Sequence, residues 1–391
     1  MALTKVDISL MDNVGTTANK LLAYDGSGNL PAVDGSQLTN VATGITESSS
    51  DPTISTNPSG GVGTQWNNTT SGEVYICTDA TAGANVWTNV GAGSGDIQPW
   101  VFQGTQYGYM AGGNPTHNVI QKYSFSTDAN ATDVGDLTAA QTYTCGSTAV
   151  THGYKGGANA PSQSSIEKWS YSTDGNSTAV GDLVASQTER VGSSSNGSYG
   201  FWHGSGSPYN IDSITKSSWA SDGDSVDTGA DLSSDKYAMG GHSSATYGYA
   251  SGGETPSSGV MINVIQKYSF SISSGTTTDV GDLTIIRRDH DCQSSTDYGY
   301  AGASGGPSPA NRIDRFAFAS DGNATDWGTL GITVQHSNGT SSTTNGYCAG
   351  SGHSPYLNHI QKISFASAGT SADIGDLTLA TGYSGTTGSN Y

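Results

Sequence analysis

His290 lies between Asp289 and Asp291, and no other residue is better placed to do chemistry. A histidine beside carboxylates can act as a general base or as a metal ligand. An isolated histidine more often forms ordinary hydrogen bonds, and this one falls where it could face the central channel of a repetitive fold. We therefore interpret His290 as a hydrogen-bonded channel residue.

The four cysteines show no spacing typical of a metal site; they are Cys77, Cys145, Cys292 and Cys348. Cys145 and Cys292 occupy nearly the same place in two internal repeats, which favours small buried residues. Turns that combine Asp, Gly and Asn are similar to calcium loops, but tight hairpins require the same residues. The sequence thus predicts no metal ligands and no cofactor.

Glycan cleavage is the strongest enzymatic alternative, because it requires two carboxylates at a controlled separation. The chain has many Asp residues but only five Arg, which are too scattered to surround a carboxylate. Turns such as Ser172-Thr173-Asp174-Gly175 resemble the Asp-box of sialidases only in part, since they lack the residue between Asp and Gly. We expect no catalytic residues and no enzyme activity.

The elements that would position these residues form six copies of one unit of roughly 48 residues, from about residue 107 to the C-terminus. Each copy starts with an aromatic-Gly-aromatic segment or a close variant and runs into a Gly-rich end. A loop follows, and then a strand of the form Ile-x-Lys-x-Ser-aromatic. These strands begin at Ile120, Ile166, Ile214, Ile265, Ile313 and Ile360.

The rest of each unit is a turn rich in Asp, Gly and Asn, a Val-Gly-Asp-Leu segment and a polar Ser/Thr/Gly stretch. Each unit therefore predicts four short strands, which we label a (polar), b (Gly-Gly), c (Ile-x-Lys) and d (Val-Gly-Asp-Leu). One such sheet cannot bury both faces alone, whereas a ring of sheets can. The sequence thus predicts an all-β chain carrying a six-bladed β-propeller.

The order of these motifs resembles the kelch family of propellers. Gly-Gly closes strand b, an aromatic residue lies in strand c, and a Leu-Thr segment precedes the inner strand. The chain departs from that family because only Trp327 supplies the usual Trp of strand d. The resemblance implies the architecture and no particular activity.

A column of basic residues on strand c tests the register of this repeat. Asp residues lie about fourteen positions downstream in most units, and we expect a c–d hairpin to pair each basic residue with this Asp. Thr329 breaks the pattern, so Arg315 should find another acceptor. The basic column is Lys122, Lys168, Lys216, Lys267, Arg315 and Lys362.

Closure of the ring requires one more strand a for the first blade. The C-terminal tail after Leu377 has the composition of the other a strands, and we expect it to complete that blade. The alternative is residues 99–104, which include the bulkier Trp100 and Phe102.

Two different pieces precede the propeller, which we assign to residues 98–391. Residues 48–97 predict a small three-stranded β-meander in which Trp66 and Trp87 are structural. Residues 1–47 predict an extended segment with a low-complexity run, Asp34-Gly35-Ser36-Gln37-Leu38-Thr39-Asn40. This run resembles the virion-attachment and shaft modules of bacteriophage tail fibres, and the meander is similar to a module found before the distal domain of such fibres and to small carbohydrate-binding folds.

The net charge of −19 is spread along the chain. Such a surface repels nucleic-acid phosphates and anionic lipids, so we expect neither nucleic-acid binding nor membrane insertion.

The b–c loops are the variable part of the repeat, and in a propeller they emerge on one face beside the blade-to-blade connections. Variable loops on a rigid ring are where recognition usually resides, and Tyr, His and Asn suit sugar rings. The predicted binding residues are His117, Asn118, Tyr209, Asn210, Met261, Tyr356 and His359.

The resemblance to tail fibres implies a virion location and a structural subunit, in a homotrimer, that contacts other virion subunits through residues 1–47. The propeller would then recognise a host surface glycan or protein. The alternatives are a purely structural or decorating virion protein and a glycan-degrading propeller enzyme.

Overall fold

The computed structural model describes residues 45–90, 103–159, 162–184, 192–205, 211–234, 236–255, 258–305, 311–352 and 355–389. The chain divides into two compact units, residues 1–99 and 100–391. Within the described ranges the regular structure consists of β-strands, so the all-β prediction is confirmed. No helix that could cross a membrane occurs in these ranges.

The first unit holds one four-stranded sheet, ordered β1 (Thr46–Ser48), β2 (Gln65–Asn68), β3 (Val74–Asp79) and β4 (Val86–Asn89). Strands β2 to β4 form the predicted antiparallel meander, and β1 adds a parallel strand beside β2. Trp87 is fully buried with Tyr75 and Cys77, and its ring meets that of Trp66 edge-on. The two tryptophans thus build the core of a small sheet. Residues 1–44 lie outside the described residues. They make up all of the predicted attachment segment, residues 1–47, except its last three residues, two of which belong to β1.

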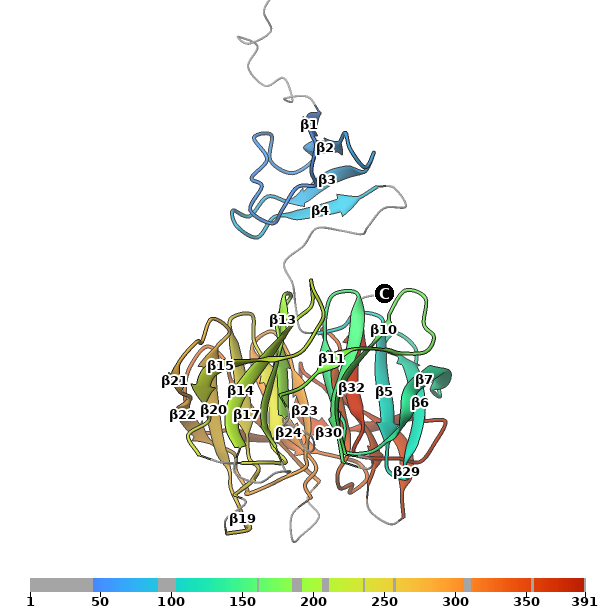
Figure 1. The fold of residues 1–391 in the computed structure, drawn as a ribbon, viewed down its shortest axis with the longest axis vertical. Coiled ribbons are helices and arrows are strands. Elements are labelled where there is room, and N and C mark those ends of the chain that lie inside the picture. Colours follow the sequence, from blue (N-terminus) through green and yellow to red (C-terminus); the bar gives the residue numbers. More distant parts are fainter. Residues whose placement is uncertain are drawn as a thin grey trace, which may run out of the picture. The chain divides into compact units, whose positions relative to one another are not determined.

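The second unit contains six sheets with the same strand order (Figure 1). Four consecutive sheets run a–b–c–d along the chain as predicted, with neighbours antiparallel, and strand a precedes strand b in each. Their strands are β8 (Cys145–Thr148), β9 (His152–Ala158), β10 (Gln163–Ser170) and β11 (Thr178–Asp182); β12 (Gly192–Ser195), β13 (Tyr199–Ser205), β14 (Ile211–Ser218) and β15 (Val226–Asp231); β16 (Gly240–Ser243), β17 (Tyr247–Ser251), β20 (Val264–Ser269) and β22 (Thr278–Asp282); β23 (Asp291–Ser294), β24 (Tyr298–Gly302), β25 (Arg312–Ala317) and β26 (Thr325–Thr329).

The last and first sheets complete the set. The sixth sheet follows the same plan, whereas the first takes its inner strand from the C-terminus: β32 pairs antiparallel with β5. The prediction that the tail completes the first sheet is therefore confirmed, while Gly104 of the alternative segment only bridges Ser342. The strands are β27 (Asn338–Ser341), β28 (Asn345–Ser351), β29 (Leu357–Ser364) and β31 (Ala372–Asp376); β32 (Gly385–Ser389), β5 (Tyr107–Gly113), β6 (His117–Ser124) and β7 (Thr132–Gln141).

The aromatic-Gly-aromatic motif has a steric cause. The glycine of strand b lies directly against the aromatic ring of strand c: a Cβ at Gly108 would stand 2.5 Å from the Tyr123 ring, and one at Gly153 would stand 2.5 Å from the Trp169 ring. The aromatic residue after each glycine is buried. The motif therefore fixes how strand c packs its ring over strand b.

Apolar clusters fill the space between consecutive sheets. One cluster joins Tyr109 and Ile120 of the first sheet to Trp169 of the second, and a corresponding cluster occurs at each later junction. A sixth cluster joins Tyr347 and Ile360 of the last sheet to Tyr123 of the first. Both faces of each sheet are thus covered by neighbours, and no hydrogen-bonded sheet closes on itself within the described ranges.

The inner strands also contact one another in cyclic order. β8 contacts β12, β12 contacts β16, and the series continues through β23 and β27 to β32, which returns to β8. Figure 1 shows β32 beside β5, so the two ends of the repetitive region meet in one sheet.

The predicted pairing of each strand c basic residue with an Asp of its own hairpin is wrong. Lys122 lies opposite Thr132 in the register, and its Nζ is 2.8 Å from Asp174 in the c–d turn of the next unit. Both faces of a sheet are covered, so a long side chain on strand c reaches the adjacent sheet rather than strand d. The same cross-sheet pairs are Lys168–Asp222, Lys267–Asp321 and Lys362–Asp128.

Two junctions lack an Asp in the corresponding turn and are joined differently. There the turn contributes a short strand, β21 (Gly275–Thr276) or β30 (Gly369–Thr370), which pairs parallel with strand d of the preceding sheet. The basic residues at these junctions lie over aromatic rings: the Arg315 guanidinium is 3.7 Å from the Trp327 ring centroid, and Lys216 is 5.1 Å from that of Tyr199. The tyrosine contact is not specific to these junctions, because Lys267, which has an Asp partner, lies 5.1 Å from the Tyr247 ring. The partner of Arg315 is thus the face of a ring, whereas the Thr329 exception predicted another acceptor.

Candidate functional site

Five connections into the inner strands hold a non-glycine residue in the left-handed backbone region. Each of these residues lies three positions before the same register position of strand a, so the five occupy equivalent places in five units. That register position is Gly146, Gly241, Cys292, Gly339 or Thr386. Such a conformation costs about 1–3 kcal/mol and gathers at functional sites. The residues, which we call the mouth residues, are Tyr143, Ala238, Asp289, His336 and Tyr383, with φ between 44° and 58°.

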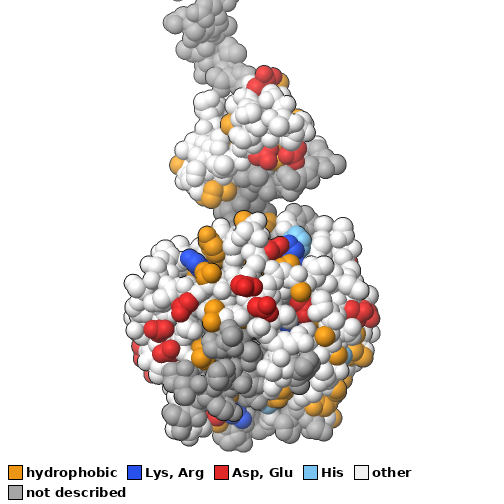
Figure 2. Space-filling view, viewed as in Figure 1, with side chains coloured by type: hydrophobic (Ala, Val, Ile, Leu, Met, Phe, Trp, Pro, Cys, Tyr) orange, Lys and Arg blue, Asp and Glu red, His pale blue; other side chains and the backbone are white. Residues whose placement is uncertain are grey.

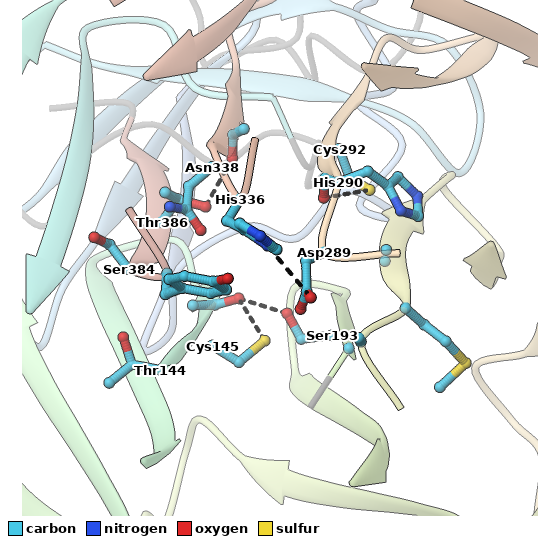
Figure 3. Close-up of a pocket in the computed structure, with 18 of the residues that line it drawn as sticks. Thr144, Cys145, Ser193, Asp289, His290, Cys292, His336, Asn338, Ser384 and Thr386 are labelled. Carbon is cyan, nitrogen blue, oxygen red and sulfur yellow. Dashed lines mark hydrogen bonds and ion pairs between the residues drawn. The ribbon is translucent and has the colours of Figure 1, made fainter. Parts of the chain in front are cut away.

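All five mouth residues line one cavity of about 130 Å³ (Figure 3). Its walls come from the connections and from the first residues of the inner strands, including Cys145, Ser193 and Cys292. Side chains from five connections that are distant in sequence therefore converge on one space.

Aromatic rings cover one side of this cavity. The Tyr383 ring lies between its neighbours, 4.2 Å from the Tyr143 ring and stacked 4.3 Å from that of His336, between centroids. The His336 ring also approaches a carboxylate. Its Nδ1 is 3.3 Å from Oδ2 of Asp289, and Figure 3 shows these two side chains pointing toward each other. The cavity thus combines ring faces with a carboxylate and an imidazole.

A b–c loop is tied to the same rim. Glu254 forms an ion pair with Arg288, the residue before Asp289, and accepts a 2.6 Å hydrogen bond from the Tyr237 hydroxyl. Glu254 begins β18 (Glu254–Thr255), which pairs with β19 (Val260–Met261) in a hairpin that projects at the lower rim in Figure 1. These contacts place the hairpin beside the connections, on the face expected for b–c loops.

Small residues form the inner wall. Ser193 donates a hydrogen bond of 2.5 Å to the carbonyl of Gly146, and Thr386 donates one of 2.7 Å to that of Gly339. A Cβ at Gly146 would stand 2.2 Å from the Thr386 backbone, so only glycine permits this approach of the inner strands. The wall therefore alternates glycine with a side chain that caps its carbonyl.

His290 lines the cavity and forms a hydrogen bond with Ser251, whose Oγ is 3.1 Å from its Nε2. Burial lowers the pKa of His290 well below its ordinary value and lowers that of His242 to about 4. Burial also raises the pKa of the Cys292 thiol. All three groups are thus neutral in neutral solution.

The predicted binding residues are spread around the rim rather than gathered. His117 is half-buried, and its Nε2 is 3.0 Å from Oγ1 of Thr381 in the last connection. Asn118 lies on β6, Met261 on β19, and Tyr356 just before β29, all half-buried. His359 lies within β29, with Nδ1 3.0 Å from Oδ2 of Asp373. Tyr209 and Asn210 lie outside the described residues.

Sequence reasoning missed the mouth residues Tyr143, His336 and Tyr383, and it did not consider His242. Their signal was present: each mouth residue precedes a small residue of strand a at a fixed offset and varies in type from unit to unit. The prediction that Cys145 and Cys292 occupy an equivalent site is wrong by one residue. Cys145 pairs with Gly156 whereas Cys292 pairs with Ala301, one register position further, so the two are not equivalent.

Neither a protein-family model nor a curated protein sequence matches this chain. Its function is therefore argued from the fold and from the cavity.

Proposed function

We propose that the six sheets are the blades of a β-propeller and that this propeller is the receptor-binding part of a bacteriophage virion appendage. The cyclic contacts of the inner strands, the six apolar clusters and the pairing of β32 with β5 support the ring. A ring is also the arrangement that covers both faces of every sheet. The kelch-like order of the motifs agrees with it.

The observation that carries the recognition role is the convergence of the mouth residues on one cavity beside the b–c loops. The backbone at these positions also joins the connections to one another, since the Asp289 amide donates to the carbonyl of Ala238 and the Tyr383 amide to that of His336. The same backbone that adopts the strained conformation therefore holds the converging side chains in a fixed array. A binding site formed by several blades is held rigid by the whole ring.

The chemistry of the rim favours a glycan over an apolar ligand. Tyr383 and Tyr143 offer ring faces, while Asp289 and His336 offer hydrogen-bonding groups. Sugars present an apolar ring face together with hydroxyl groups, so they match such a mixture. Acidic side chains are scattered over the face shown in Figure 2. Negative charge of this kind repels the phosphates of nucleic acid.

Assignment to a virion rests on residues 1–90. The run from Asp34 to Asn40 and the small β-meander resemble modules that precede the distal domains of phage fibres. In this proposal the N-terminal segment joins other virion subunits, and the fibre is a homotrimer.

Binding of the full-length protein to an array of bacterial surface polysaccharides, and to a panel of intact bacteria, tests the proposal. Tyr383→Ala should reduce binding at least tenfold, because it removes the ring between Tyr143 and His336. The matched control is Tyr247→Ala, which removes an exposed tyrosine at the opposite end of a strand b.

Binding that is equal in both variants would contradict recognition at the cavity. Absence of binding to every strain and polysaccharide would favour a purely structural virion role. Release of reducing sugars from a bound polysaccharide would favour the glycan-degrading alternative instead.

A further inference from the structure

Two histidines and a cysteine from neighbouring sheets converge at the wall of the cavity. His242 lies on β16, His290 immediately precedes β23, and Cys292 lies on β23. One ligand atom from each lies within 4.8 Å of the other two. His242 and His290 are buried, and His290 and Cys292 also line the cavity, as Figure 3 shows for both.

The imidazoles are oriented in the way that metal-binding histidines are. Nδ1 of His242 lies 3.2 Å from the carbonyl oxygen of Gln293 and donates its hydrogen there, which leaves a lone pair on Nε2. Oγ of Ser251 lies 2.8 Å from that Nε2 and 3.1 Å from Nε2 of His290. Both Nε2 atoms therefore face the Ser251 hydroxyl, which a bound ion would displace from them, and a backbone carbonyl fixes the tautomer of His242.

Gly240 leaves space beside Sγ of Cys292 and Nε2 of His290. A Cβ at Gly240 would stand 2.0 Å from Sγ of Cys292 and 2.5 Å from Nε2 of His290. Any other residue there would displace both groups. The bare backbone thus lets a thiol of one sheet and the edge of the neighbouring sheet approach the same small space.

All three side chains depart from the residues that the repeat carries at equivalent places. Where His242 stands, the other units have Ser147, Ser194, Gln293, Thr340 and Thr387, and where Cys292 stands they have Gly146, Ser193, Gly241, Gly339 and Thr386. Where His290 stands, the other units have Thr144, Val191, Met239, Ser337 and Ser384. The three departures meet at one junction, although each arose at a different repeat position.

We propose that His242, His290 and Cys292 bind one Zn²⁺ ion at the wall of the cavity. Two imidazole nitrogens and a thiolate are ligands that Zn²⁺ prefers, and three protein ligands leave a fourth position open. At bond lengths of about 2.0 Å to nitrogen and 2.3 Å to sulfur, tetrahedral ligands stand about 3.3–3.8 Å apart. The three atoms would therefore close in by about an ångström. The ion would tie the fourth and fifth sheets together there.

Metal titration of the full-length protein tests this assignment, with Zn²⁺ measured by mass spectrometry after dialysis and Co²⁺ used as a spectroscopic probe. We expect one Zn²⁺ per chain and, with Co²⁺, a thiolate-to-metal charge-transfer band. Cys292→Ser should abolish the band, and His242→Gln should weaken metal binding at least tenfold.

Cys145→Ser is the matched control, because Cys145 lines the same cavity outside the cluster, and its band should equal that of the wild type. The proposal is overturned if the dialysed protein holds no stoichiometric Zn²⁺, or if the Co²⁺ band survives in Cys292→Ser. Circular dichroism of each variant verifies that it is folded. Should Cys292→Ser unfold, His290→Gln takes its place, and its expected result is Co²⁺ binding at least tenfold weaker than that of the wild type.

Discussion

At the scale of single residues, buried histidines make the stability of the fold depend on pH. His203 is fully buried on β13, and none of the described residues forms a hydrogen bond with either ring nitrogen. Burial, together with the nearby His242, lowers the pKa of His203 to about 3. An unfolded histidine has a pKa near 6.5, so the unfolded chain binds the proton first as the pH falls.

Because the unfolded chain binds this proton first, protonation of His203 lowers the free energy of unfolding at acidic pH. His203 has no effect on the pH dependence above pH 6.5, and it destabilises the folded state progressively as the pH falls from 6.5 toward 3. We expect His203→Leu to reduce the loss of unfolding free energy between pH 7 and pH 4.5 by about 2–3 kcal/mol, at about 1.4 kcal/mol per pH unit. Urea denaturation of both proteins at the two pH values measures it. An identical loss in wild type and variant would contradict the buried, neutral histidine.

A second residue-scale contrast separates exposed from buried ion pairs. Lys155 and Glu167 are fully buried, and Glu167 also accepts hydrogen bonds from the Thr138 amide and Ser177. Glu167→Ala leaves a buried ammonium without its carboxylate and should cost about 3–5 kcal/mol. Lys122→Ala, which removes a partly exposed pair, should cost no more than about 1 kcal/mol. Equal losses of unfolding free energy in denaturant titrations would refute this distinction.

At the scale of elements, each of the six junctions between neighbouring sheets is held by one of two kinds of contact, an ion pair or a short parallel strand pairing. Four turns carry an Asp that pairs with a lysine of the preceding sheet, and two turns instead add β21 or β30 to that sheet. The Asn of a turn also reaches back: Oδ1 of Asn176 accepts the amide of Asp136 at 3.0 Å. The Asp-Gly-Asn turns thus connect neighbouring sheets through an ion pair and a hydrogen bond.

The parallel bridge between β26 and β30 yields a matched pair of glycine substitutions. A Cβ at Gly328 would stand 2.0 Å from the carbonyl oxygen of Gly369, whereas one at Gly369 would meet nothing within 4 Å. We expect Gly328→Ala to destabilise the protein by about 1–3 kcal/mol and Gly369→Ala to change stability by less than about 0.5 kcal/mol. Thermal unfolding of the two variants compares them, and a larger loss for Gly369→Ala would count against the bridge.

Sequence reasoning located the strands because the motifs recur at fixed offsets, and it placed the C-terminal strand correctly. It misassigned the lysine partners because a hairpin pairing is local, whereas the true partner lies in the turn of another unit. It also overlooked the residue after each strand c isoleucine. Gln121, for example, is buried, and its Oε1 accepts the amide of Leu379 at 3.1 Å. Both faces of each sheet are covered, so alternation did not reveal such residues as buried.

The same contrast between local sequence patterns and contacts between distant units applies to the candidate site. His290, which lines the cavity, stood out in the sequence because it lies between two Asp residues. The convergence of Tyr143, His336 and Tyr383 depends on the close approach of inner strands that are far apart in the chain, which one unit of sequence does not encode.

At the scale of the whole molecule, the contacts of the last unit with the first decide whether the repetitive region behaves as one cooperative body. β32 pairs with β5, Lys362 pairs with Asp128, and Tyr347 stacks on Phe125. Each of these joins residues more than two hundred positions apart. An open series of the same sheets would expose the edge of β5 and one apolar face at each end.

Removal of residues 385–391 tests this closure. The truncated chain loses β32, the Thr386 hydrogen bond to Gly339 and the cover of the β5 edge, so we expect it to unfold without a single cooperative transition and to self-associate. A synthetic peptide of residues 384–391 added in trans should restore one transition, because a strand can join an open sheet edge. The same peptide with proline at Thr386 and Thr387 cannot complete the ladder and should fail to rescue. If the truncated protein unfolds at the wild-type midpoint in size-homogeneous form, closure through the C-terminal strand does not stabilise the molecule.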